Sequence, residues 1–280
     1  MSRHKLFAAV AAALAMAASA PSYAITVTLN NNVHDLMNAL VAPGSGLNVI
    51  SATLSGHYDD ANLVGSTGTY TNASGTYGIG NGIVLSTGNV LDYGDGENNV
   101  GDRTYEYGIA ATAAQEALLD PITGGTYSHF DVTQLDITFT TSTGEVYFYV
   151  VFGSEEYDEY VGSPFNDGFG MFLNGVNIAK VGGLPVNISH PDVKPIPGTE
   201  LDGVLAPNGN PLLLFGATGL DTNAVHTLTF ILADTSDAIY DTTVYISGLR
   251  GQNPVIPEPT TLWLMASGLA TLALRRKRAA

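Results

Sequence analysis

The chain is organised around VVFGSEEYDEYVGSPFNDGFGMFLN, the stretch from Val150 to Asn174. The stretch begins as the end of one apolar strand and finishes as the start of another, with a connection rich in carboxylates, aromatics and glycines between them. Like charges at this density repel one another, so a folded chain either points them into water or places a cation between them. The acidic residues of this connection, with no Lys or Arg among them, are Glu155, Glu156, Asp158, Glu159 and Asp167.

A second acidic connection, ADTSDAIYD from Ala233 to Asp241, lies between two later strands. If the strands ending at Phe152 and Ala233 run in the same direction, both connections emerge at one end of the fold. Calcium takes oxygen ligands from carboxylates and amides, commonly on loops. We therefore predict a calcium site, with water-facing turn residues as the alternative. The candidate ligands are Glu155, Glu156, Asp158, Asn166, Asp167, Asp234, Asp237 and Asp241.

Alternation of apolar and polar residues predicts antiparallel strands in much of the chain. Residues 135–141 and 145–153 flank the turn Ser142-Thr143-Gly144, and this pattern predicts a hairpin. Two-faced strands with long loops at their ends predict an all-β fold, an antiparallel, jelly-roll-like β-sandwich with one or two short helices. Further strands are expected at 48–55, 82–87, 169–173, 176–181, 212–215, 227–233 and 242–249.

Two segments have the pattern of short helices. Residues 32–42 place apolar side chains on one face of a predicted helix, and Pro43-Gly44 ends this helix. Residues 110–119 form the second candidate, closed by Asp120-Pro121. Asn174-Gly175 predicts a tight turn between two strands.

The N-terminus has the pattern of a secretory signal. A basic start is followed by an apolar run from Leu6 to Ala20 and by Ser22-Tyr23-Ala24, which predicts cleavage after Ala24. The apolar run of about 15 residues is shorter than the roughly 20 needed to span a membrane, which favours a signal over an anchor. The expected partners are the Sec translocon and signal peptidase.

The C-terminus combines three features in order: Pro257-Glu258-Pro259, an apolar run from Thr260 to Leu274, and the basic cluster Arg275–Arg278. This tail resembles the PEP-CTERM sorting signal of Gram-negative bacteria. The resemblance implies transient insertion of a C-terminal transmembrane helix in the inner membrane, with the basic end cytoplasmic. It also implies that an exosortase removes the tail near the Pro-Glu-Pro motif and that the body reaches the cell surface or the exterior. An ordinary single-pass tail anchor is the alternative.

The segment between the two signals, residues 25–255, is strongly acidic. It carries 25 Asp and Glu against four basic residues, a net charge of −21. Such a surface makes nucleic acid and anionic lipid poor partners and favours divalent cations or a cation-bridged polysaccharide. The chain has no cysteine, which excludes disulfides and thiol chemistry. The four basic residues are Arg103, Lys180, Lys194 and Arg250.

Three runs of this body resemble the choice-of-anchor L family of secreted bacterial surface domains: 82–88, 151–175 and 233–245. The family occurs with differing C-terminal anchors, and a PEP-CTERM tail is one of them. The resemblance therefore implies three parts: a signal peptide at 1–24, a choice-of-anchor L-like β-sandwich domain at 25–255 and a sorting tail at 256–280.

Motifs for catalysis are absent from the sequence. No serine has glycine at both −2 and +2, and no histidines form an HExxH pattern. We therefore expect no enzyme, and favour a structural or adhesive protein of the cell surface or biofilm matrix, linked to exopolysaccharide. A carbohydrate-binding module and a polysaccharide hydrolase are the alternatives.

Overall fold

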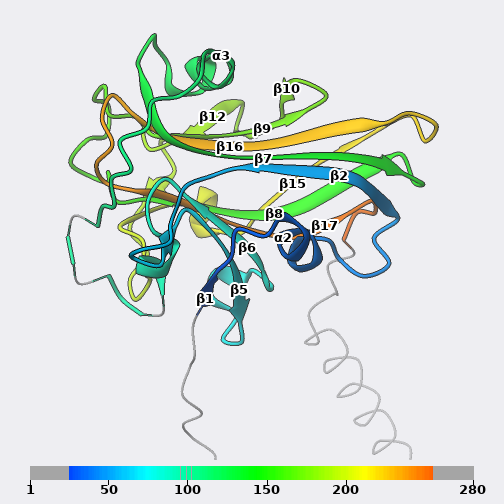
Figure 1. Ribbon diagram of the computed structural model, residues 1–280, viewed down its shortest axis with the longest axis horizontal. Coiled ribbons are helices and arrows are strands. Elements are labelled where there is room, and N and C mark those ends of the chain that lie inside the picture. Colours follow the sequence, from blue (N-terminus) through cyan, green and yellow to red (C-terminus); the bar gives the residue numbers. More distant parts are fainter. Residues whose placement is uncertain (1–24, 95, 99, 102, 255–280) are drawn as a thin grey trace, which may run out of the picture.

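The computed structural model describes residues 25–94, 96–98, 100–101 and 103–254. The predicted signal segment and the sorting tail lie outside these residues. In the described part, two antiparallel sheets are stacked face to face (Figure 1). This confirms the predicted all-β sandwich. No helix in the described ranges is long and apolar enough to cross a membrane.

The first sheet has the strand order β1-β5-β6-β17-β8-β14-β13, and β15 pairs with β8 as well. Its strands are β1 (Ile25–Leu29), β5 (Thr67–Asn72), β6 (Gly82–Ser86), β8 (Glu145–Ser154), β13 (Val193–Lys194), β14 (Gly203–Leu205), β15 (Leu213–Thr218) and β17 (Thr242–Arg250).

The second sheet has the order β11-β12-β9-β16-β7-β2, with β10 paired to β9. Its strands are β2 (Leu47–Ser55), β7 (His129–Thr141), β9 (Gly168–Leu173), β10 (Val176–Asn177), β11 (Lys180–Val181), β12 (Leu184–Asn187) and β16 (His226–Thr235). A separate two-stranded ribbon joins β3 (Tyr58–Asp59) to β4 (Val64–Gly65), and single 3₁₀ turns lie at η1 (Thr76–Gly78), η2 (Val90–Tyr93) and η3 (Pro207–Gly209).

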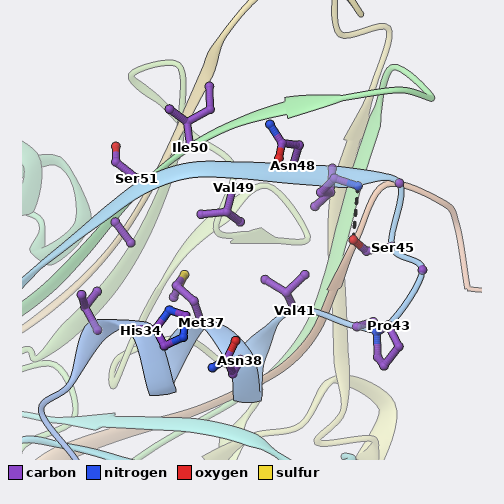
Figure 2. Close-up of a pocket in the computed structure, with 16 residues that line it drawn as sticks. His34, Met37, Asn38, Val41, Pro43, Ser45, Asn48, Val49, Ile50 and Ser51 are labelled. Atoms are coloured by element: carbon purple, nitrogen blue, oxygen red, sulfur yellow. Dashed lines mark hydrogen bonds between the residues drawn. The ribbon is translucent and has the colours of Figure 1, made fainter.

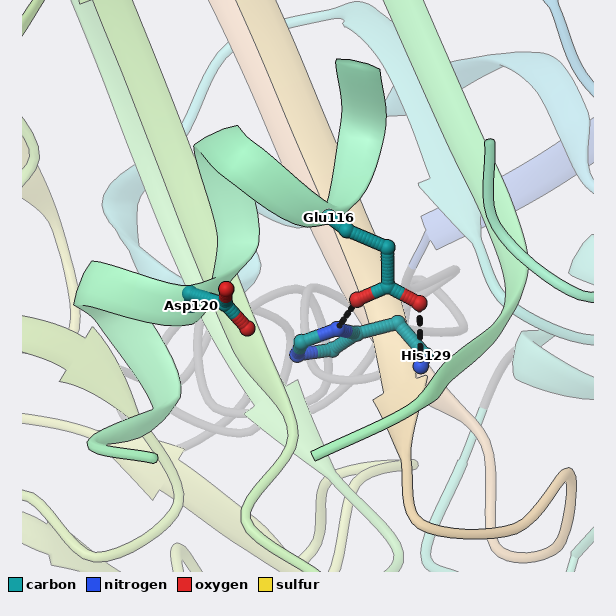
Figure 3. Close-up of side chains that lie close together, drawn as sticks. All are labelled: Glu116, Asp120 and His129. Carbon is teal, nitrogen blue, oxygen red and sulfur yellow. Dashed lines mark hydrogen bonds and ion pairs between the residues drawn. The ribbon is translucent and has the colours of Figure 1, made fainter. Parts of the chain in front are cut away.

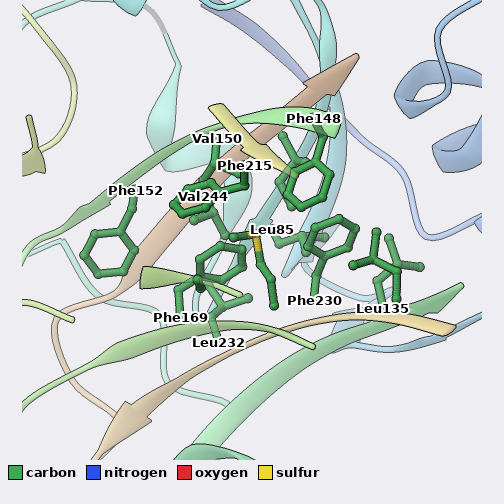
Figure 4. Close-up of a cluster of buried hydrophobic side chains, with 14 of the residues drawn as sticks. Leu85, Leu135, Phe148, Val150, Phe152, Phe169, Phe215, Phe230, Leu232 and Val244 are labelled. Carbon is green, nitrogen blue, oxygen red and sulfur yellow. The ribbon is translucent and has the colours of Figure 1, made fainter. Parts of the chain in front are cut away.

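The main core fills the space between the two sheets (Figure 4). Phe148 of β8 meets Phe230 of β16 edge to face, with ring centroids 5.2 Å apart. Phe169 of β9 stacks on Phe230 at 6.5 Å. Full burial of each such side chain contributes about 1.5–3 kcal/mol, so this layer stabilises the packing of one sheet on the other.

Two α-helices flank the sheets. In α2 (Val33–Leu40), Asn32 accepts hydrogen bonds from two backbone N–H groups at the helix start, and Leu36 and Leu40 are fully buried. In α3 (Ala113–Thr123), a reciprocal capping pair is formed by Thr112 and Gln115. Figure 1 shows α3 on the outer face of the second sheet, where Leu119 and Ile122 join a small apolar cluster with side chains of β9 and β16.

The end of α3 differs from the prediction. The helix continues through Pro121 to Thr123, and the backbone N–H of Gly124 closes it by donating to the Asp120 carbonyl at 3.3 Å. Proline removes one helical hydrogen bond here, but only in the last turn. Burial of Ile122 against the sheet offsets that loss, so packing overrides the local stop signal.

The predicted hairpin of residues 135–141 with 145–153 is also wrong. β7 pairs with β16 and β2, whereas β8 pairs with β17, β14 and β15, so the two strands lie in opposite sheets. The turn at Ser142–Gly144 therefore carries the chain from one sheet to the other. Alternation shows which side of each strand is apolar, but it leaves open whether the two apolar sides lie side by side or face each other. The Asn174-Gly175 turn joins β9 to β10 as predicted.

Candidate functional site: a buried acidic rim

The two acidic connections meet at one end of the sandwich, on the left in Figure 1. β8 and β16 belong to opposite sheets and both end there. The backbone N–H of Glu155 donates to the Asp241 carbonyl at 3.0 Å, and the N–H of Thr235 donates to Asp167 Oδ1 at 2.8 Å. Hydrogen bonds thus cross directly between the connections.

Strand alternation explains why carboxylates enter the interior here. The core-facing positions of β16 are Leu228, Phe230 and Leu232, and Asp234 continues that face. Asp167 precedes Phe169 on the core-facing side of β9 in the same way. A β-bulge in the pairing of β16 with β7 puts the extra residue on β7, between Phe130 and Thr133, opposite Leu232 and Asp234.

Burial separates the predicted ligands into three groups. Asp237 is partly buried and Asp158 is exposed, so neither belongs to the interior set. Six are buried: Glu155, Glu156, Asn166, Asp167, Asp234 and Asp241. We use the name acidic rim for the five carboxylates of this set, Glu155, Glu156, Asp167, Asp234 and Asp241.

Two of the buried residues are fully engaged by the protein. Asp167 accepts a hydrogen bond at each oxygen, from the Thr235 backbone and from the Thr242 hydroxyl at 2.7 Å. Asn166 donates to the Thr123 carbonyl at 2.7 Å and accepts from the Ser189 backbone at 3.2 Å. Asn166 therefore links the segments of Thr123 and Ser189, and its side-chain oxygen already accepts one hydrogen bond.

The other four carboxylates keep oxygens without a hydrogen-bond partner among the described residues. Asp234 is 1% exposed, and neither of its oxygens has a partner. Asp241 is fully buried; its Oδ1 accepts from the Tyr105 backbone at 3.1 Å, while Oδ2 has no partner. Glu155 Oε1 and Glu156 Oε2 are also without one. A buried acceptor left unpaired costs about 1–3 kcal/mol, and more when it is charged.

Burial raises the pKa of every carboxylate in the rim. Burial holds the pKa of Asp234 well above its usual range, and the charges of Asp167 and Asp241 raise it further. The nearby Thr87 hydroxyl lowers this pKa to a lesser extent, although it does not form a hydrogen bond of normal geometry with Asp234. Burial, with the charge of Asp202, raises the pKa of Glu155 to about 8. Burial also raises the pKa of Glu156, and the negative charge of Asp167 raises it further.

Positive charge near the rim is scarce. Arg103 lowers the pKa of Glu155, but its guanidinium donates to Asn98 Oδ1 at 3.1 Å. Asn98 in turn donates to Glu155 Oε2 at 2.6 Å. Within the described ranges, no Lys, Arg or His forms a salt bridge with a rim carboxylate. The negative charge of the rim is therefore largely uncompensated by the protein, and a bound cation would neutralise part of it.

The rim carboxylates form a chain of neighbours and not a preformed ring. Across the part of the chain that the structure describes, the one set of three acidic or histidine side chains with ligand atoms all within 4.8 Å of one another is Glu116, Asp120 and His129 (Figure 3). A cation at the rim would therefore draw its carboxylates closer together and would need further oxygens to complete its shell.

The Glu116 set is explained by packing. His129 is fully buried, its Nδ1 lies 2.5 Å from Glu116 Oε2, and its backbone N–H donates to Glu116 Oε1 at 3.1 Å. The Thr123 hydroxyl lies 3.2 Å from His129 Nε2. This hydroxyl–imidazole–carboxylate order resembles a hydrolase triad, but Thr123 and His129 are both buried, so the contacts fasten α3 to β7. Sequence reasoning missed this set; Glu116 and Asp120, four positions apart on a helix, were the available signal.

Sequence reasoning also missed Asp131. Its carboxylate accepts three backbone N–H groups, from Tyr107, Gly108 and Ile109, at 2.7–3.1 Å. Together with the bond from the Tyr105 backbone to Asp241, these contacts hold the extended segment 105–109 beside the rim. No motif in the sequence indicates this role.

A groove of about 740 Å³ lies elsewhere, between α2 and the edge strand β2 (Figure 2). Met37, Val41 and Val49 point into it. His34 is its one titratable side chain, so the groove offers no acid–base pair.

Comparison with known proteins agrees with this architecture. The family model described as Choice-of-anchor L domain matches residues 26–249, and the model described as PEP-CTERM protein-sorting motif matches residues 255–278. The chain belongs to the choice-of-anchor L domain family and carries a sorting motif for exosortase, as the sequence predicted. The sorting motif implies export and sorting to the cell surface in a Gram-negative bacterium. No curated protein and no solved structure matched the chain.

Proposed function

We propose that this chain is a structural or adhesive component of the cell surface or extracellular matrix, linked to exopolysaccharide. The observation that carries the proposal is the pairing of an exosortase sorting motif with a strongly acidic β-sandwich. A body with a net charge of −21 at residues 25–255 has little affinity for anionic lipid, but it can bind a polysaccharide through bridging divalent cations. The tail would hold the precursor in the inner membrane until exosortase removes it.

Catalysis is not part of this proposal. The choice-of-anchor L domain is a non-catalytic type of domain. Thr123, His129 and Glu116 form a hydroxyl–imidazole–carboxylate arrangement, but its hydroxyl is buried. The rim carboxylates are buried and do not line the groove of Figure 2. These facts support a binding or structural role.

The test is cosedimentation with exopolysaccharide purified from the bacterium that carries the gene. The processed protein should pellet with the polysaccharide in calcium and be retained in the extracellular matrix in vivo. Wild-type retention of the matrix in a deletion strain, together with no cosedimentation, would contradict the structural role.

A carbohydrate-binding module is the second candidate, favoured by one cluster of aromatic side chains. The ring of Tyr107 stacks on His57 with centroids 4.8 Å apart and lies 4.9 Å from Tyr105. The Tyr105 hydroxyl donates to Asp59 Oδ2 at 3.2 Å. Aromatic faces beside carboxylates suit sugars. Binding to a neutral oligosaccharide without calcium, abolished in Tyr105→Ala, would favour this second function over the first.

A further inference from the structure

We propose that the acidic rim is a calcium site whose central ligands are the carboxylates of Asp234 and Asp241, with Glu155 and Glu156 contributing from the facing connection. Asp167, already bonded at both oxygens, would orient the site from beside Asp234.

The strongest evidence is the state of Asp234. Its carboxylate lies at the core-facing end of β16, is 1% exposed, and has no hydrogen-bond partner in the described chain at either oxygen. Asp241 Oδ2 is fully buried and has no partner in normal hydrogen-bond geometry, although the Tyr93 hydroxyl lies near this carboxylate. Nearly all buried polar groups in folded proteins are paired, so unpaired buried oxygens on neighbouring carboxylates indicate a missing positive partner.

A single shared proton does not satisfy all the unpaired oxygens of the rim. One proton can join two carboxyl groups, and the side chains of Asp167 and Asp234 are close enough to share one. The charge of Asp241 also acts on Asp234, and a single proton cannot neutralise all three carboxylates. Oxygens of Glu155 and Glu156 are also without partners nearby in the fold. A divalent cation carries enough charge to neutralise two carboxylates and enough coordination positions to satisfy several oxygens at once.

The ligand chemistry selects calcium among divalent cations. The rim offers oxygen alone; the buried His129 is held by Glu116 and the chain has no cysteine, which disfavours zinc and other soft or borderline metals. Magnesium prefers a small octahedral shell that retains several waters, whereas calcium takes six to eight oxygens in irregular geometry. An exported protein also meets calcium at the concentrations that extracellular sites require.

A cation at Asp241 would fix the segments around it. The Asp241 backbone N–H donates to the Arg103 carbonyl at 3.2 Å, and its Oδ1 accepts from Tyr105. Gly88 packs so closely that an added Cβ would lie 1.7 Å from Asp241 Oδ2. The site therefore ties the connection after β16 to the segment after β6 and to the chain from Arg103 to Tyr105.

The experiment is isothermal titration of the processed protein, first stripped with chelator, with calcium chloride or magnesium chloride. We expect saturable binding of calcium with a Kd no weaker than about 1 mM, as for extracellular calcium modules, and at least tenfold weaker binding of magnesium. Asp234→Asn should weaken calcium binding at least tenfold. The matched control is Asp158→Asn, the same change in the same acidic surroundings at an exposed position, and it should change the Kd less than twofold.

Circular dichroism of each variant shows whether it folds. If Asp234→Asn does not, terbium luminescence sensitised by nearby tyrosines provides a measurement on the wild-type protein, and calcium should displace the terbium. No heat of binding and no displaceable terbium signal in millimolar calcium would overturn the proposal. Equal calcium affinity in folded Asp234→Asn and wild type would also overturn it.

Discussion

Removal of calcium should lower the melting temperature of the processed protein substantially. The perturbation is dialysis against excess chelator, compared with the same protein in saturating calcium. Without the ion, three deeply buried oxygens, both of Asp234 and Oδ2 of Asp241, have no partner in the described chain. At about 1–3 kcal/mol for each such oxygen, the cost is about 3–9 kcal/mol before protonation relieves part of it.

Mass action gives a second value for the same quantity. Calcium at about 100 times its Kd stabilises the native state by about 2.7 kcal/mol. A domain of this size shifts its melting temperature by about 2–4 °C for each kcal/mol, which predicts a difference of about 5–11 °C. The second figure lies just below the first range, as expected if protons satisfy some of the rim oxygens when calcium is removed.

Differential scanning calorimetry at pH 7 measures the difference, and Asp234→Asn supplies the internal comparison. The variant should melt at nearly the same temperature in calcium and in chelator, because it lacks the central ligand. Asp158→Asn should keep the full wild-type difference, since its side chain is exposed. Identical wild-type curves in calcium and in chelator would refute this reasoning and leave the rim as a set of protonated carboxyl groups.

Three further results are expected. In chelator, the free energy of unfolding should fall as pH rises from about 5 to 8. The reason is that burial raises the pKa of Glu155 to about 8, so the folded state still holds a proton that the unfolded state has released. Urea titrations in which stability rises across this pH window would contradict the prediction. Gly88→Ala should lower both stability and calcium affinity by displacing the Asp241 carboxylate, whereas Gly80→Ala, where a Cβ meets nothing within 4 Å, should change calcium affinity less than twofold. Intact mass of the extracellular protein should correspond to a chain from Ile25 to about Pro257; a mass that still includes Trp263 and Arg275–Arg278 would refute processing.

Much of the fold follows from alternation alone. Leu228, Phe230 and Leu232 share a face in the sequence, and the structure places that face in the core. Alternation does not say which strands become neighbours, so the predicted hairpin of β7 with β8 is wrong, although three of the four predicted boundaries lie within one residue of those observed; β7 begins six residues earlier, at His129. Strand pairing depends on contacts between residues far apart in the sequence, which local patterns do not encode.

The site was predictable in part. The same two-residue period that buries Phe230 also points Asp234 inward, and the strand directions bring both acidic connections to one end. Glu156 is buried and Asp158 is exposed, and this difference depends on the path of the irregular connection, which has no periodic pattern in the sequence. Asp131 and the Glu116–His129 pair escaped prediction because their partners are backbone N–H groups or a residue on another element.

The most direct test of the calcium site is a crystal structure of the processed protein grown in calcium, with anomalous data collected at a wavelength where calcium scatters. We predict an anomalous peak at the acidic rim, with oxygens of Asp234 and Asp241 about 2.3–2.6 Å from it and those of Glu155 or Glu156 completing the shell. A structure without such a peak, in which the rim carboxylates are bridged only by protons and water, would contradict it.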